Sequence, residues 1–136
     1  MDLIEFFKDP RFVSQWYYDW DTKEPDMIFP QQRHFMIMKD GLGMSVQASE
    51  YHYCCPRRNL EIGVEDYFEY EVGFPTEKVP QFMEFAENPE EPTSTVYGYV
   101  PLDVIQEVIC LHGGIDIEAT LAKIEAKNQK QLENKQ

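Results

Sequence analysis

Apolar residues recur at every second position through the middle of the chain, from residue 60 to residue 74, with one interruption at Asp66. These positions are Leu60, Ile62, Val64, Phe68, Tyr70, Val72 and Phe74, and the positions between them include Glu61, Glu65, Glu69 and Glu71. A period of two is typical of a β-strand with one buried face and one solvated face. The pattern therefore predicts strand structure with a row of carboxylates on its open side, interrupted by a turn or bulge near Glu65 and Asp66.

Two apolar runs on either side of Asp40-Gly41 predict a β-hairpin over about residues 33–49. The first run is His34–Met38, and the second, Met44–Ala48, alternates apolar and polar residues. An Asp-Gly pair between such runs is the strongest short-range hairpin signal. We expect the sheet to continue through residues 51–55 and to receive a last strand at residues 96–100.

Helical signals mark both ends of the chain. Asp9-Pro10 has the chemistry of a helix start, and the apolar residues that follow at helical spacing are Phe12, Val13, Trp16, Tyr17 and Trp20. Toward the C-terminus we expect a short helix over residues 79–86, a loop over 87–95 and a helix from Pro101 to about His112 that Gly113-Gly114 ends. Asp116 would then cap a last helix.

Together these elements predict an α+β fold, with an antiparallel sheet of four to six strands and with the N-terminal and C-terminal helices packed on one face. Residues 1–127 would form a single globular domain, and residues 128–136 a frayed polar tail. The expected core is drawn from Phe35, Ile37, Val46, Tyr70, Val72, Ile105, Ile109, Leu121 and Ile124.

The composition is that of a folded globular protein, with 43% apolar, 14% aromatic and 27% charged residues. No apolar run approaches the roughly 18 residues of a membrane span, and the N-terminus lacks the basic segment of a secretory signal. Three cysteines, two of them adjacent, do not make a disulfide framework. We therefore expect a cytoplasmic protein with reduced thiols.

Two cysteine–histidine groups are the only candidates for catalytic or metal chemistry. His52 with Cys54, and Cys110 with His112, would supply the four ligands of a tetrahedral zinc site. Neither pair has zinc-finger spacing, and no Gly-rich oxyanion element follows Cys54 and Cys55. We favour structural roles for these residues and expect no catalytic residue, metal or cofactor. A small-ligand site around residues 52–55 and the hairpin stays open as an alternative.

The charge of the chain is concentrated in one segment. Fourteen of the 25 acidic residues lie between Asn59 and Glu118, where Lys78 is the only base, so this segment alone accounts for the formal net charge of −13. Such a field repels nucleic acid and anionic membranes, attracts basic surfaces and weakens as salt rises. The charge therefore favours a basic protein as partner.

Three phrases resemble small proteins encoded on bacteriophages and other mobile elements. They are GLGMSVQASEYHYCCPR (41–57), YEVGFP (70–75) and VYGYVPLDVIQEVICLHGGID (96–116). The resemblance covers about half of the chain and transfers no catalytic pattern. It implies a protein of the bacterial host cytoplasm, where small acidic phage proteins block defence nucleases of CRISPR and restriction systems.

Charge and resemblance together predict a non-enzymatic inhibitor whose acidic surface imitates nucleic acid and occupies a basic channel of a host protein. The expected contact residues are Glu65, Asp66, Tyr67, Glu69 and Glu71 on the strand, with Tyr67 as a solvent-facing anchor, and Glu87, Glu90 and Glu91 in the loop. The alternatives are a small-ligand binding or sequestering module, and a structural protein whose acidic face only keeps it soluble.

Overall fold

The computed structural model describes residues 1–134 and confirms the α+β class. The elements in chain order are α1 (Leu3–Lys8), the 3₁₀ helix η1 (Pro10–Phe12), β1 (Val13–Asp19), β2 (Glu24–Arg33), β3 (Met36–Ile37), β4 (Gly43–Gln47), β5 (Glu69–Gly73), the 3₁₀ helix η2 (Pro80–Phe85), β6 (Val96–Pro101), α2 (Leu102–Leu111) and α3 (Ile117–Asn134).

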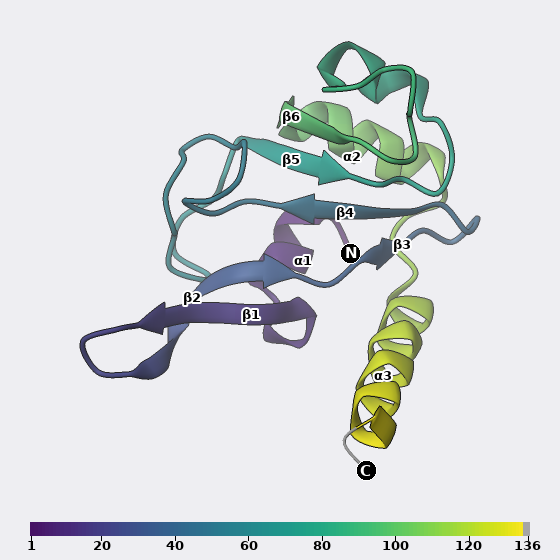
Figure 1. Ribbon diagram of the computed structural model, residues 1–136. Coiled ribbons are helices and arrows are strands. Elements are labelled where there is room, and N and C mark those ends of the chain that lie inside the picture. Colours follow the sequence, from purple (N-terminus) through teal and green to yellow (C-terminus); the bar gives the residue numbers. More distant parts are fainter. Residues whose placement is uncertain (135–136) are drawn as a thin grey trace.

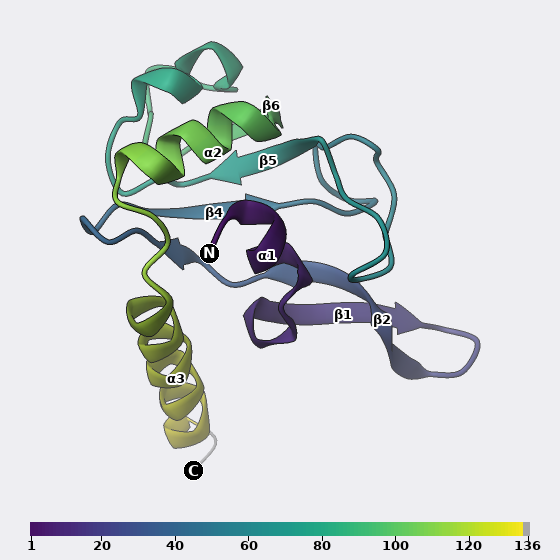
Figure 2. The same cartoon turned by 180° about the vertical axis from the view of Figure 1, so that it is seen from behind.

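The strands form two antiparallel sheets. The larger has the order β3-β4-β5-β6, and β1 pairs with β2 in a two-stranded sheet. In Figure 1 α1 and α2 lie behind the larger sheet, and in Figure 2, seen from the other side, they lie in front of it. Both helices therefore cover the same face, while α3 leads away from the sheet toward the side on which β1 and β2 lie (Figure 1).

The core fills the space between the larger sheet and the helices α1 and α2. Of the predicted core residues, five are buried as expected: Val46, Tyr70, Val72, Ile105 and Ile109. The other four are only partly buried: Phe35, Ile37, Leu121 and Ile124. In the first strand of the hairpin Met36 and Met38 take the buried positions instead. A shift of one residue moves every side chain of a strand to its other face, and the unbroken apolar run offered no local cue to the register.

The prediction of a helix after Asp9-Pro10 was wrong. Asp9 does cap a helical turn, by accepting a hydrogen bond from the Arg11 N–H, but that turn is η1 and only three residues long. The chain then continues as strand β1, which pairs with β2 along its whole length. The α-helix comes earlier and is capped by Asp2, whose side chain accepts from the Glu5 N–H. Valine, tyrosine and tryptophan favour strands, and pairing with a partner strand overrode the helical spacing.

The predicted strand structure of residues 51–55 and 60–68 was also wrong. Residues 51–55 form turns and bends and not a strand, with Cys55 bridging to Glu69, and regular strand starts at Glu69. The expected turn falls at residues 62–64, slightly before the predicted place, where Gly63 has a φ of +81°. This turn breaks the period of two. Tyr67 is buried, whereas the neighbouring Phe68 is exposed.

The predictions for the hairpin and for residues 79–116 are confirmed. β3 and β4 form the hairpin of residues 33–49, and η2, β6 and α2 lie where their patterns placed them. Gly113 and Gly114, with φ near +90°, end α2. Asp116 caps α3 by accepting from the Ala119 N–H. The predicted tail 128–136 differs: α3 continues to Asn134, and residues 135–136 lie outside the described part.

Candidate functional site

The alternation of β5 gives the larger sheet an open face. Tyr70 and Val72 are buried toward α1 and α2, so Glu69 and Glu71 lie on the opposite side. Tyr70 pairs with Val100 and Val72 pairs with Tyr97, which leaves two residues of β6 opposite Glu71. This is a β-bulge, a feature that redirects side chains and is frequent beside functional sites.

The bulge residues, Gly98 and Tyr99, are covered by Tyr53 from the loop that follows β4. A Cβ on Gly98 would lie 3.2 Å from the Tyr53 Cβ, so glycine allows this close approach. The Tyr99 N–H donates to the Tyr53 carbonyl oxygen at 3.0 Å, and the two ring centroids are 6.0 Å apart. Tyr99 has a φ of +54°, a conformation that non-glycine residues rarely adopt and that is often retained at functional sites. Tyr53 and Tyr99 are both more than 40% exposed.

Glu71 lies beside Tyr53 of this aromatic pair. Burial raises the pKa of its carboxyl, and the negative charge of Glu87 also raises it, whereas a backbone hydrogen bond from Tyr53 and the positive charge of Arg57 act to lower it. The two carboxylates are thus close enough to repel each other, although they come from a strand and a loop that are distant in sequence. A cation placed between them would relieve this repulsion.

The acidic loop that carries Glu87, Glu90 and Glu91 is held by hydrogen bonds to β6. The Glu87 N–H donates to the Val96 carbonyl oxygen at 3.0 Å, and the buried Tyr97 hydroxyl donates to the Pro92 carbonyl oxygen. Its three glutamates are exposed. None of the ion pairs within residues 1–134 involves these three glutamates, and none involves Glu69 or Glu71. We call Tyr53, Glu69, Glu71, Glu87, Glu90, Glu91 and Tyr99 the acidic–aromatic patch.

Three of the predicted contact residues lie elsewhere. Glu65 and Asp66 are exposed, but each already has a cation, from Arg58 at 3.2 Å and from Lys8 of α1 at 3.4 Å. The expectation that Tyr67 faces solvent was wrong, since only 4% of it is exposed. Its hydroxyl donates to the Arg58 carbonyl oxygen and accepts from the Leu60 N–H, so Tyr67 holds the loop in place.

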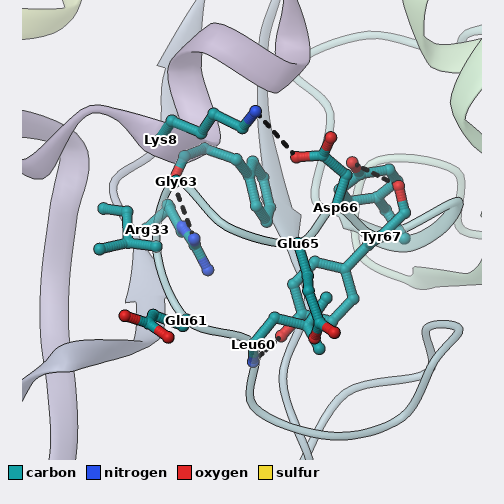
Figure 3. A pocket seen from close by; sticks show the side chains of 11 residues that line it. Lys8, Arg33, Leu60, Glu61, Gly63, Glu65, Asp66 and Tyr67 are labelled. Carbon is teal, nitrogen blue, oxygen red and sulfur yellow. Dashed lines mark hydrogen bonds and ion pairs between the residues drawn. The ribbon is translucent and has the colours of Figure 1, made fainter.

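These residues surround a small pocket whose innermost group is Arg33 (Figure 3). The Arg33 guanidinium is buried over the Phe7 ring, 4.0 Å from its centroid, and donates to the Phe7 carbonyl oxygen at 2.9 Å. Burial lowers its pKa to about 10. In Figure 3 Asp66 points toward Lys8 at the rim. The pocket has a volume of about 10 Å³, which is room for about one water molecule and too little for an organic ligand.

The sequence pattern did not reveal Tyr53 and Tyr99 as members of the site. The one local signal was Gly98, because an isolated glycine inside a strand indicates a bulge or a close backbone approach. Which residue approaches that glycine depends on a loop more than 40 positions earlier in the chain.

The structure does not bring the two cysteine–histidine groups together. His52 Nδ1 lies 2.6 Å from the buried Ser49 hydroxyl, whereas His112 Nδ1 lies 2.6 Å from Asp40 at the hairpin turn. Within residues 1–134 there is no group of three or more histidine, cysteine or acidic side chains that could hold a metal ion. Cys54 is buried and burial raises the pKa of its thiol, which disfavours the reactive thiolate.

No helix between residues 1 and 134 has the length and apolar character needed to cross a membrane. Comparison with protein-family models, with curated proteins and with solved structures finds no match to this chain.

Proposed function

We propose that this protein is a non-enzymatic binding protein that docks its acidic–aromatic patch on a basic surface of another protein, one that otherwise holds nucleic acid. The observation that carries the proposal is the group of unpaired carboxylates around Glu71 and Glu87, held in place beside two exposed tyrosines. The resemblance to phage-encoded proteins supports a host defence nuclease, of the CRISPR or restriction type, as partner and the bacterial cytoplasm as its place of action.

The two components of the patch would act at different stages of binding. The net charge of −13 speeds the approach of a basic partner, and this steering is screened as salt rises. Tyr53 and Tyr99 supply the directional contacts of the complex, since tyrosine is enriched among residues that dominate binding energy and its ring face attracts lysine and arginine. Arg57 already lies 5.3 Å from the Tyr53 ring centroid, so a guanidinium of the partner would take the place of Arg57 on this ring.

The ordered loop adds to the case for a binding surface. Since its backbone is fixed by the Glu87–Val96 and Tyr97–Pro92 hydrogen bonds, the backbone that carries Glu87, Glu90 and Glu91 need not be ordered on binding. Preorganised contacts lose less conformational entropy when a complex forms. The ion-paired Glu65 and Asp66 contribute less, because a partner would have to displace Arg58 and Lys8.

Charge reversal tests the proposal. The tagged wild-type protein should capture a basic, nucleic-acid-handling protein from its natural host, and DNA or RNA should compete with the capture. The variant E87K/E91K should lose binding more than tenfold, whereas the control D21K/E24K, with the same change in net charge in the β1–β2 turn region, should bind as the wild type does. The Tyr99→Ala variant should mainly speed dissociation.

Three outcomes would contradict the proposal. One is a partner that nucleic acid fails to displace. Another is an equal loss of affinity in both double variants, which would mean that total charge, and not this patch, governs association. The third is that no basic protein is captured, in which case the acidic face serves solubility alone.

A further inference from the structure

A groove opens between α3 and the segment that leads from β2 to β3, away from the acidic–aromatic patch. It has a volume of about 590 Å³. One wall is formed by Gln32, His34 and Phe35, and the other by Lys123, Lys127 and Lys130 of α3. In both ribbon views α3 and the β1–β2 sheet extend from the same side of the larger sheet (Figures 1 and 2).

The first turn of α3 anchors this wall. The Ile37 N–H donates to the hydroxyl of the fully buried Thr120 at 3.1 Å, and the Asp116 N–H donates to the Ile37 carbonyl oxygen at 2.8 Å. Beyond Ile124 the helix has no buried residue as far as Asn134. The second half of α3 therefore lies along the groove and does not fill it.

The groove is cationic in a strongly acidic protein. Lys123, Lys127 and Lys130 follow the spacing i, i+4 and i+7, which places them on one side of the helix. None of the residues that line the groove within the described chain is acidic, and none of the ion pairs of residues 1–134 uses these lysines. Like charges at i, i+4 destabilise a helix, so stability of α3 alone does not explain the arrangement.

The positive charge of the lysines also affects His34 on the opposite wall of the groove. His34 is half-buried, and its pKa is lowered first by burial and then by the positive charge of Lys127. The Lys123 ammonium group lies 4.4 Å from the centroid of the Phe35 ring. Phe35, Ile124 and Ala126 add an apolar surface next to the amines. The groove thus combines a cationic wall with an apolar surface beside it.

We propose that this groove binds a small organic anion, with a carboxylate, phosphate or sulfonate group at the lysines and an apolar body against Phe35 and Ile124. The volume lies within the roughly 300–1,000 Å³ of small-molecule sites, which are mostly apolar with a few polar groups that fix orientation. Nucleic acid is a poorer occupant, because the rest of the chain carries the negative charge that repels it. The inference is independent of the proposed function, since it uses neither the same residues nor the same sign of charge.

A pair of fluorescent probes tests the proposal. The first is 8-anilinonaphthalene-1-sulfonate, and the second is N-phenyl-1-naphthylamine, which has the same apolar body without the sulfonate. We expect saturable binding of the sulfonate at one site, with at least tenfold lower affinity for the uncharged probe. Histidine NMR should show an upward shift of the His34 pKa when the sulfonate is bound, because an anion offsets the effect of the positive charge of Lys127.

Substitutions in the groove test whether the sulfonate binds there. Lys123→Gln combined with Lys127→Gln and Lys130→Gln should weaken sulfonate binding at least tenfold, while the control Lys23→Gln with Lys78→Gln should leave it unchanged. Circular dichroism checks that the variants fold. Ala126→Trp, which keeps the charge but fills the groove, should also abolish binding.

Three results would overturn the proposal. They are absence of saturable sulfonate binding, equal affinity for the two probes, and equal losses in the lysine variant and its control. A polyglutamate peptide that displaces the sulfonate and binds more tightly would instead identify an acidic protein segment as the occupant.

Discussion

Replacing Thr120 by valine should show how far α3 depends on one side chain. Valine has nearly the same shape as threonine and a similar helix propensity, so the substitution leaves no cavity and does not alter the intrinsic stability of the helix. It removes the hydroxyl that accepts from the Ile37 N–H at 3.1 Å. The Asp116 carbonyl oxygen loses the hydroxyl as a donor but still accepts from the Thr120 N–H.

The expected loss follows from the donor that is left without a partner. Thr120 is fully buried and Ile37 is half-buried, so water replaces the bond poorly. An unsatisfied buried donor costs about 1–3 kcal/mol. For a chain of this size, that corresponds to a melting temperature lower by roughly 4–12 °C. Chemical denaturation and thermal melts followed by circular dichroism would measure the change.

Thr76→Val is the matched control. The Thr76 hydroxyl also accepts from a backbone N–H of the hairpin, that of Gly43 at 2.9 Å, but Thr76 is exposed and water can take its place. We expect a loss below about 1 kcal/mol. Hydrogen exchange should show faster opening of α3 in Thr120→Val, with β4 and β5 still protected. Equal losses in the two variants would refute the idea that Thr120 anchors the helix.

Other substitutions test the two faces of β5, the acidic loop and the buried tyrosines. Val72→Ala should lower the free energy of unfolding by roughly 1–3 kcal/mol. Glu71→Gln should leave it unchanged or raise it slightly at neutral pH, because the raised pKa of Glu71 means that folding disfavours its ionised form. Similar losses for the two variants in urea titrations would contradict the assigned faces. Tyr97→Phe should cost about 0.5–1.5 kcal/mol and speed proteolysis of the loop at Pro92, and unchanged cleavage would show that this bond does not hold it. Burial raises the pKa of Tyr67 to about 12, so its contribution to stability is complete below pH 10 and is lost as the pH rises to about 12. In Tyr67→Phe the melting temperature should fall less steeply over this pH range than in the wild type. An identical slope in the two proteins would contradict this role of Tyr67.

Features encoded by short stretches of sequence were predictable. The hairpin around Asp40-Gly41, the helix ended by Gly113-Gly114 and the Asp116 cap all depend on residues a few positions apart, so local backbone preferences suffice to specify them. The α+β class and the acidity of the central segment follow from pattern and composition alone.

The tertiary structure decided whatever depends on pairing between distant segments. The stretch from Val13 to Asp19 has both helical spacing and strand propensity, and its pairing with β2 selects the strand. Past the turn at Gly63 the chain resumes with a different phase, which buries Tyr67 instead of exposing it.

The two candidate binding surfaces also depend on contacts between distant segments of the chain. Tyr53 meets Tyr99 because the loop after β4 folds over a bulge in β6, and Lys127 comes near His34 because Thr120 fixes the start of α3 against β3. A sequence determines which charges and rings a chain possesses. Which of them become neighbours depends on burial and hydrogen bonding summed over the whole fold, and no local window of sequence contains that sum.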